Sequence, residues 1–212
     1  MDRQPATAVA YGGRVPPPRL LRWRAARWWL PPFVLVVALG TAAVVLVWWV
    51  RVPPAPTRAD AVVVLGGNGA RLDRGLALTR AGTAPVLVLS AGVLDGGCRH
   101  LGEPVRGAYV PVGRLPAVPG VAVECLDPVP FTTQGEARGL IDLARSRGWH
   151  HVVVVSTTDQ ANRAWLRVRR CERPQNDVMV GFSLVGSGSG VLTASAYQLA
   201  GWAKALVTER GC

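Results

Sequence analysis

Residues that can bind an anion follow several apolar segments of this chain. Gly66, Gly67 and Asn68 directly follow the valine-rich run Ala61–Leu65, and a helical pattern opens soon after them. A glycine-rich turn between a strand and a helix lets backbone N–H groups approach a negatively charged ligand. Hydroxyl, carboxyl, amide and guanidinium side chains follow the later apolar runs in the same way. The candidate site therefore consists of Gly66, Gly67, Asn68, Arg71, Ser90, Thr132, Thr133, Glu136, Ser156, Thr157, Gln160 and Arg163.

Glycine N–H groups, hydroxyls and guanidinium groups together suit a phosphate, a pyrophosphate or a carboxylate. Each residue type also has a purely structural role. Threonine hydroxyls cap helices, and a glutamate in a first helical turn interacts favourably with the helix dipole. Arginines can also lie on a solvated helix face. The sequence is compatible with both interpretations.

No motif in the sequence defines a reaction, so the catalytic residues stay unknown. The glycines are not followed by the Lys-Ser or Lys-Thr of a P-loop, and there is no Gly-x-Ser-x-Gly motif. His150 and His151 precede an apolar run, which places them at the opposite edge of a sheet. Glu136 and Asp159 are the side chains that could act as acid or base. We expect no cofactor and no metal, because there is no Cys-x-x-Cys spacing.

The elements that must position these residues indicate an α/β fold. Strand-like runs alternate with helical patterns, which predicts a Rossmann-like parallel sheet with helices on both faces. The run after Asp60 is the expected central strand, and the loops after the strands converge at the carboxyl edge of the sheet. The expected strands are 61–65, 85–89, 121–124, 151–155 and 177–182, and the expected helices are 71–81, 136–147, 159–171 and 192–209. In the last helix, Tyr197, Leu199, Trp202 and Leu206 should face mostly inward.

An uncharged apolar run from Phe33 to Val50 precedes this domain, with paired tryptophans at both ends. It is long enough to cross a hydrocarbon core of about 30 Å. Most of the nearby arginines precede the run, which predicts a cytoplasmic N-terminus by the positive-inside rule. A cleaved signal peptide is the alternative. We therefore expect a disordered basic cytoplasmic tail (1–31), one transmembrane helix (32–51), a linker (52–58) and an extracytoplasmic domain (59–212).

The formal net charge of +11 does not indicate a nucleic-acid partner. Much of the basic excess lies before residue 59, whereas a nucleic-acid-binding domain carries its basic face on the domain itself. The expected partner is the lipid bilayer.

The four cysteines all follow the apolar run, and an even count in an exported domain suggests disulfides. Four cysteines allow three pairings. Cys98 and Cys125 bracket a segment rich in proline and glycine that has little core of its own, so a bridge would hold it. Cys171 ends an expected helix and Cys212 ends the sequence. We therefore favour the pairs Cys98–Cys125 and Cys171–Cys212.

Several short motifs, in this order, resemble the YdcF-like family, a domain of unknown function shared with the SanA and ElyC envelope proteins. The similarity is to a membrane-anchored member of actinobacterial type. It implies a Rossmann-like sheet, an envelope location, and a role in cell-wall or lipid-carrier metabolism, and it adds Gly92 to the candidate site. The motifs are DAVVVLGG (60–67), Arg71-Leu72, Arg80-Ala81-Gly82, LSAG (89–92), TTQGEA (132–137) and VSTTDQANRA (155–164).

Two departures from the family pattern bear on function. Gln160 occupies the position of a family histidine, and glutamine cannot take up a proton at neutral pH. Gly135 stands where many members carry an acid. The resemblance implies binding of a phosphorylated cell-wall precursor or lipid carrier, and envelope proteins are further expected partners. A non-catalytic binding or scaffold module is the alternative. An S-adenosylmethionine-binding protein is a third, although an extracytoplasmic domain would lack that cofactor.

Overall fold

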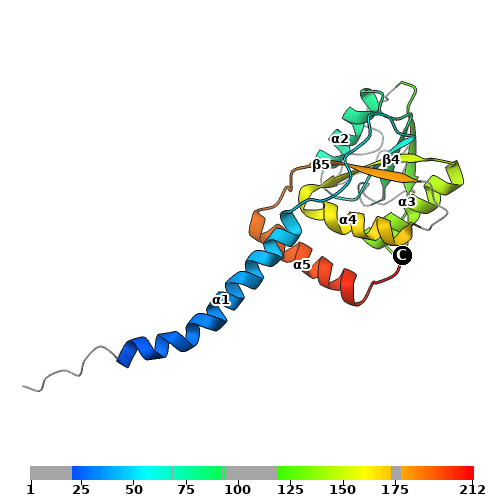
Figure 1. Ribbon diagram of the computed structural model, residues 1–212. Helices are drawn as coiled ribbons and strands as arrows, with labels where there is room; N and C mark the ends of the chain where they lie inside the picture. The colour runs from blue at the N-terminus through cyan, green and yellow to red at the C-terminus, as the bar shows by residue number, and fades with distance from the viewer. Residues whose placement is uncertain (1–20, 68, 92, 94–118, 173–177) are drawn as a thin grey trace, which may run out of the picture. The chain divides into compact units, whose positions relative to one another are not determined.

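The computed structural model describes residues 21–67, 69–91, 93, 119–172 and 178–212 (Figure 1). Helices and strands alternate among the described elements, except that one strand follows another before residue 126. Contacts divide the chain into a unit that ends at Ala42 and a unit from Ala43 to Cys212. The elements are α1 (Leu21–Trp48), β1 (Ala61–Val64), α2 (Gly69–Arg80), β2 (Val86–Ser90), β3 (Ala122–Leu126), α3 (Thr133–Arg147), β4 (His151–Thr157), α4 (Thr158–Cys171), β5 (Met179–Val185) and α5 (Val191–Val207).

The second unit has an α/β fold around a five-stranded sheet, which confirms the expected fold class at this level. The strand order is β3-β2-β1-β4-β5, and every neighbouring pair is parallel. β1 is the central strand, as expected, and all four of its residues are buried. The third strand begins at Ala122 and ends at Leu126, slightly later than the sequence suggested.

Alternate residues of β1 build the two faces of the core because successive strand side chains point to opposite sides. Val62 and Val64 pack with Leu72 and Leu76 of α2. Val63 faces the other way, into the cluster that contains the buried side chains of α3 and α4. Both faces of the sheet are therefore covered by helices, as the continuous apolar strands predicted.

The expected orientation of α5 was wrong for its largest side chains. Tyr197 and Leu206 are exposed, and Leu199 and Trp202 are half-buried. The buried residues of α5 are Ala194, Ser195, Gln198 and Ala205. α5 packs against α4 through these mostly small residues, which let two helices approach closely. Its large apolar side chains are consequently left on the outside.

α1 begins at Leu21, inside the segment that was expected to be a tail, and contains Pro31 and Pro32. In the part of the chain that the structure describes, no helix satisfies the length and hydropathy that a membrane span requires. The last turn of α1 belongs to the second unit. There Val47 is buried, and Trp48 Nε1 donates a hydrogen bond to Ser195 Oγ of α5 at 2.8 Å. The segment after α1 is held by Asn162 of α4, whose Nδ2 donates a hydrogen bond to the Trp49 carbonyl.

A disulfide joins Cys171 at the end of α4 to Cys212, which confirms one of the two expected pairs. The other pair involves Cys98, which lies outside the described residues. The Cys171–Cys212 bond holds the segment after α5 against α4. Around it, Arg138 donates to the Cys212 carbonyl, and Gln134 donates to the Gly211 carbonyl at 3.1 Å.

Candidate functional site

The site lies at the carboxyl edge of the sheet, where β1 and β4 are neighbours. The connection from β1 leads to β2 on one side, whereas β4 leads to β5 on the other. The loops after β1 and β4 therefore diverge and leave a crevice between them, which is where ligands bind in open α/β sheets. Gly66 and Gly67 follow β1, and α4 begins at Thr158 immediately after β4.

Glu136 is the buried acid of the site and lies in the first turn of α3. Thr132 begins this turn by accepting a hydrogen bond from the Gly135 amide at 3.4 Å, as the predicted cap requires. Glu136 Oε1 accepts two hydrogen bonds, one from the Gly66 amide at 2.7 Å and one from Ser90 Oγ at 2.6 Å. A carboxylate from α3 thus links the ends of β1 and β2.

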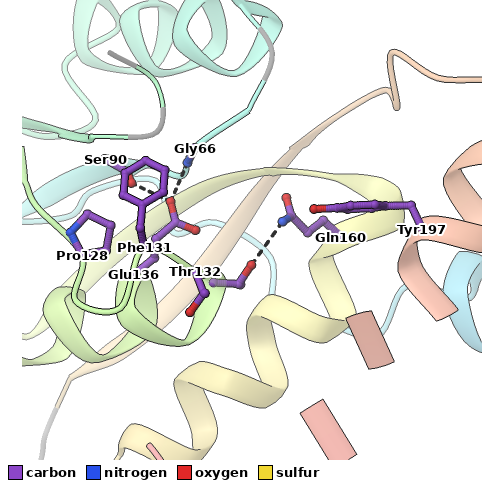
Figure 2. Close-up of a pocket in the computed structure, with 9 residues that line it drawn as sticks. Gly66, Ser90, Pro128, Phe131, Thr132, Glu136, Gln160 and Tyr197 are labelled. Carbon is purple, nitrogen blue, oxygen red and sulfur yellow. Dashed lines mark hydrogen bonds between the residues drawn. The ribbon is translucent and has the colours of Figure 1, made fainter. Parts of the chain in front are cut away.

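The pKa of Glu136 is raised above its ordinary value because burial penalises the charged form. The hydrogen bonds from Ser90 and Gly66 and the positive charges of Arg71 and Arg163 oppose this effect. The second carboxyl oxygen has no hydrogen bond among the residues drawn in Figure 2 and points away from Ser90, into the pocket. Glu136 is therefore the side chain of the site that is best placed to exchange a proton with a ligand.

Arg71 is buried and its guanidinium is already committed to the protein. Its Nη1 donates to the Gly66 carbonyl, and its Nη2 donates to Thr157 Oγ1 at 2.9 Å and to Gln160 Oε1 at 2.5 Å. Gly67 has φ = 152°, and an added Cβ there would lie 2.5 Å from Arg71 Cζ. The loop after β1 needs glycine at position 67 partly because the Arg71 guanidinium lies so close to its backbone. Arg71 therefore joins the loop after β1 to the start of α4.

Arg163 differs from Arg71 in which guanidinium nitrogen lacks a partner among the described residues, since in Arg71 it is Nε and in Arg163 it is the terminal Nη2. It is only 8% exposed, and its Nε donates to Gln198 Oε1 at 3.0 Å. Within the described residues its Nη2 has no hydrogen-bond partner. Gly201 of α5 makes room for the group, since a Cβ there would lie 2.9 Å from Arg163 Cζ. Burial lowers the pKa of Arg163, but arginine remains protonated at neutral pH.

Gln160 bridges two parts of the site. Its Oε1 accepts from Arg71, and its Nε2 donates to Thr133 Oγ1 at 3.4 Å. It is 8% exposed. The amide thus has both an acceptor and a donor in use, and its role is to orient neighbours. Ser156 is fully buried at the end of β4, so its hydroxyl belongs to the interior.

Three cavities surround Tyr197, and we name them by their linings. The neutral cavity, of ≈ 200 Å³, is lined by Ser90, Phe131, Thr133, Glu136, Gln160 and Tyr197 among others, with no lysine or arginine among its described lining residues (Figure 2). The cationic cavity, of ≈ 310 Å³, is lined by Arg163, Arg167, Lys204, Thr132, Thr133 and Tyr197 among others. The loop cavity, of ≈ 480 Å³, lies between Gly66–Gly67 and the start of α5.

The structure brings most of the predicted residues together. Gly66, Gly67, Arg71, Ser90, Thr132, Thr133, Glu136, Thr157, Gln160 and Arg163 line one or more of the three cavities. Asn68 and Gly92 lie outside the described residues. His150 and His151 are at the amino end of β4, where their amides donate to Asp60 Oδ2, so the histidines stand away from the site as expected.

Sequence reasoning missed the contributions of the loop before α3 and of α5. Phe131 lines two of the cavities and Tyr197 lines all three. Gln198 links Arg163 to Asp159, because its Nε2 donates to Asp159 Oδ2 at 3.0 Å. The signal was present, since the loop 186–190 also follows a parallel strand and therefore also ends at the carboxyl edge.

The glycine at position 135 has a steric explanation. A Cβ at this position would lie 1.9 Å from the Pro130 carbonyl oxygen and 2.9 Å from the Val129 carbonyl carbon. The backbone of the loop before α3 leaves no room for a side chain. An acid is therefore incompatible with this conformation of the loop that presents Phe131 and Thr132.

Comparisons with family models, with curated proteins and with solved structures found no match to this chain.

Proposed function

We propose that this protein is a membrane-anchored, extracytoplasmic component of cell-envelope biogenesis whose domain binds a phosphate-bearing cell-wall or lipid-linked ligand. The observation that carries the ligand class is the buried guanidinium of Arg163, a residue that lines the cationic cavity and whose Nη2 has no partner among the described residues. A buried donor without a partner is costly, and a bound oxyanion would satisfy it with a charge-assisted hydrogen bond.

The charges around the cationic cavity support an anion. Arg167 and Lys204 both pair with Glu209, at 2.6 and 2.8 Å. In the described part of the chain, no acid forms an ion pair with Arg163. Thr132 and Thr133 add hydroxyls to the same wall. Arg163 is therefore the cation whose charge is available to a phosphate.

The geometry of Gln160 favours binding over proton-transfer chemistry at that position. Both ends of its amide are engaged, by Arg71 and by Thr133. A non-catalytic binding module is accordingly the form of the proposal that we prefer. Detection of product formation from a lipid pyrophosphate by the purified protein would contradict this preference.

Replacing Arg163 by alanine should weaken the binding of inorganic phosphate by about tenfold to a hundredfold, because a hydrogen bond to a charged group contributes about 1.5–3 kcal/mol. Isothermal titration calorimetry of the purified full-length protein measures this change. Arg169→Ala is the matched control, since Arg169 is on the same helix but is exposed and paired with Glu172. Equal affinities of wild type and Arg163→Ala, with both proteins folded, would contradict the proposed ligand class.

The proposed anchor is supported by the side chains of α1 in the first unit. Trp29, Phe33 and Val36 are 76, 66 and 68% exposed. A continuous apolar surface of this kind needs an apolar partner. The excess of arginines before Phe33 supports a cytoplasmic N-terminus.

Alkaline phosphatase fused after Cys212 should be active in a bacterial host, because the enzyme needs an oxidising exterior to form its own disulfides. The same reporter fused after Pro31 should be inactive. Activity of both fusions would indicate that the apolar run is not needed for export, and inactivity of both would contradict the extracytoplasmic location. Cell fractionation provides the second readout, with the full-length protein expected in the membrane fraction.

A further inference from the structure

We propose that the neutral cavity binds a sugar ring and that the neighbouring cationic cavity binds the phosphate attached to it, so that the ligand is a glycosyl phosphate. This inference rests on the proposed function, which supplies the phosphate. It adds the chemical class of the group that carries the phosphate. The four observations that follow support it.

The first observation is the lining charge of the two cavities. No lysine or arginine is among the described residues that line the neutral cavity, whereas Arg163, Arg167 and Lys204 line the cationic cavity. In the ionised form, the buried carboxylate of Glu136 repels a phosphate, since charges interact strongly away from water. The phosphate is therefore directed to the cationic cavity, and the neutral cavity is left for an uncharged group.

The second observation is the free hydrogen-bonding capacity around Glu136. Oε1 is taken up by Gly66 and Ser90, while the other oxygen faces the neutral cavity. A carboxyl group exchanges hydrogen bonds with a hydroxyl in either protonation state. Thr133 and Gln160 lie on the same wall, and their mutual hydrogen bond leaves the Thr133 O–H and the second N–H of Gln160 as donors. This set of donors and acceptors matches the several hydroxyl groups of a sugar.

The third observation is a pair of exposed aromatic rings. Phe131 and Tyr197 are each 67% exposed and stand on opposite sides of Glu136 and Gln160 (Figure 2). The face of an aromatic ring is negatively polarised and attracts positively polarised C–H groups. A sugar ring presents C–H groups on its faces and hydroxyls around its edge. It can therefore use the rings and the polar side chains of this cavity at the same time.

The fourth observation is size and adjacency. A cavity of ≈ 200 Å³ is smaller than the range of about 300–1,000 Å³ for drug-sized ligands, and it suits a single ring. The neutral and cationic cavities share Phe131, Thr132, Thr133 and Tyr197. A ring in one cavity therefore lies next to a phosphate in the other, as the direct bond in a glycosyl phosphate requires.

Calorimetric titration of the full-length protein with three probes tests the inference. The probes are glucose 1-phosphate, hexyl phosphate and inorganic phosphate. Glucose 1-phosphate should bind about tenfold more tightly than the other two, because an aromatic contact contributes up to about 1.5 kcal/mol. Phe131→Ala should remove this advantage and lower the affinity for inorganic phosphate much less, because Phe131 lines both cavities but has no hydrogen-bond donor to offer a phosphate. Val129→Ala should change none of the affinities, since Val129 is exposed in the same loop and lines neither cavity.

The outcomes that overturn the inference are distinct from those that overturn the proposed function. Equal affinity for the three probes, or tighter binding of hexyl phosphate, would rule out a sugar subsite. If Phe131→Ala lowers the affinity for inorganic phosphate as much as the affinity for glucose 1-phosphate, Phe131 only supports the loop. If no probe binds, or if Arg163→Ala leaves all affinities unchanged, the phosphate site itself is wrong.

Discussion

Replacing Glu136 by alanine should destabilise the domain by about 3 kcal/mol. The change leaves the Gly66 amide and the Ser90 hydroxyl without their acceptor, and each unsatisfied buried group costs about 1–3 kcal/mol. The two lost hydrogen bonds join three elements. Gly66 follows β1, Ser90 ends β2, and Glu136 lies in the first turn of α3. Urea-induced unfolding of the purified protein, followed by circular dichroism, measures the difference.

Glu136→Gln is the matched control for this prediction. The glutamine oxygen can accept the same two hydrogen bonds, so its stability at neutral pH should stay close to that of the wild type or exceed it. If the alanine and glutamine variants lose the same amount, the hydrogen bonds at Oε1 do not stabilise the fold. That result would contradict the role assigned to Glu136.

The wild type and the Glu136→Gln variant together test the raised pKa of Glu136. The folded state holds the proton of Glu136 more tightly than the unfolded state, whose pKa is near 4.5. Folded protein therefore binds more protons across the window above that value, and stability falls as the pH rises through it. Relative to Glu136→Gln, the wild type should lose stability between pH 4 and pH 8. If the difference in the free energy of unfolding between the wild type and Glu136→Gln is the same at every pH, the pKa of Glu136 is not raised.

Removing the Cys171–Cys212 disulfide should cost about 4 kcal/mol. The bond closes a loop with a sequence separation of 41, and the chain-entropy estimate for such a loop is of this size. The bond also holds the segment that carries Glu209, which pairs with Arg167 and Lys204 beside the cationic cavity. Urea unfolding of a Cys171→Ala/Cys212→Ala double variant checks the value.

The single variant Cys212→Ala separates the cross-link from local packing. If the cross-link is responsible, the single and the double variant should lose nearly the same stability, because either change breaks the same bond. If the stability lost by the double variant instead equals the sum of the losses of Cys212→Ala and Cys171→Ala, the effect comes from packing around the two side chains. An unchanged unfolding midpoint would show that the bond does not stabilise the domain.

The elements of the domain could be predicted from the sequence because their signals are local. The run Ala61–Leu65 is apolar throughout, and only a strand covered on both faces needs this pattern. The loops that follow the strands then had to meet at one edge, since parallel strands share their direction. A threonine cap for α3 was expected from Thr132 or Thr133, and Thr132 provides it. The pairing of Cys171 with Cys212 was favoured because Cys171 ends an expected helix and Cys212 ends the sequence.

The roles of the site residues depended on segments that are far apart in the chain. Arg71 and Arg163 looked equivalent as anion ligands. Both guanidinium groups keep one nitrogen without a partner among the described residues, but in Arg71 it is Nε, since Gly66, Thr157 and Gln160 engage the two terminal nitrogens, whereas in Arg163 it is the terminal Nη2. Thr157 and Gln160 lie more than 80 residues from Arg71 in sequence. No local pattern reports which nitrogens of a buried guanidinium group are already engaged.

The sequence by itself determined the α/β fold, the central strand and the edge of the sheet at which the site forms. The tertiary structure decided which of the site residues face a cavity. Tyr197 illustrates the difference, because its spacing in the sequence suggested the interior of the fold. α5 instead packs on α4 through small residues, and Tyr197 stands where three cavities meet. Periodicity defines the faces of a helix, but the packing of its neighbours decides which face is buried.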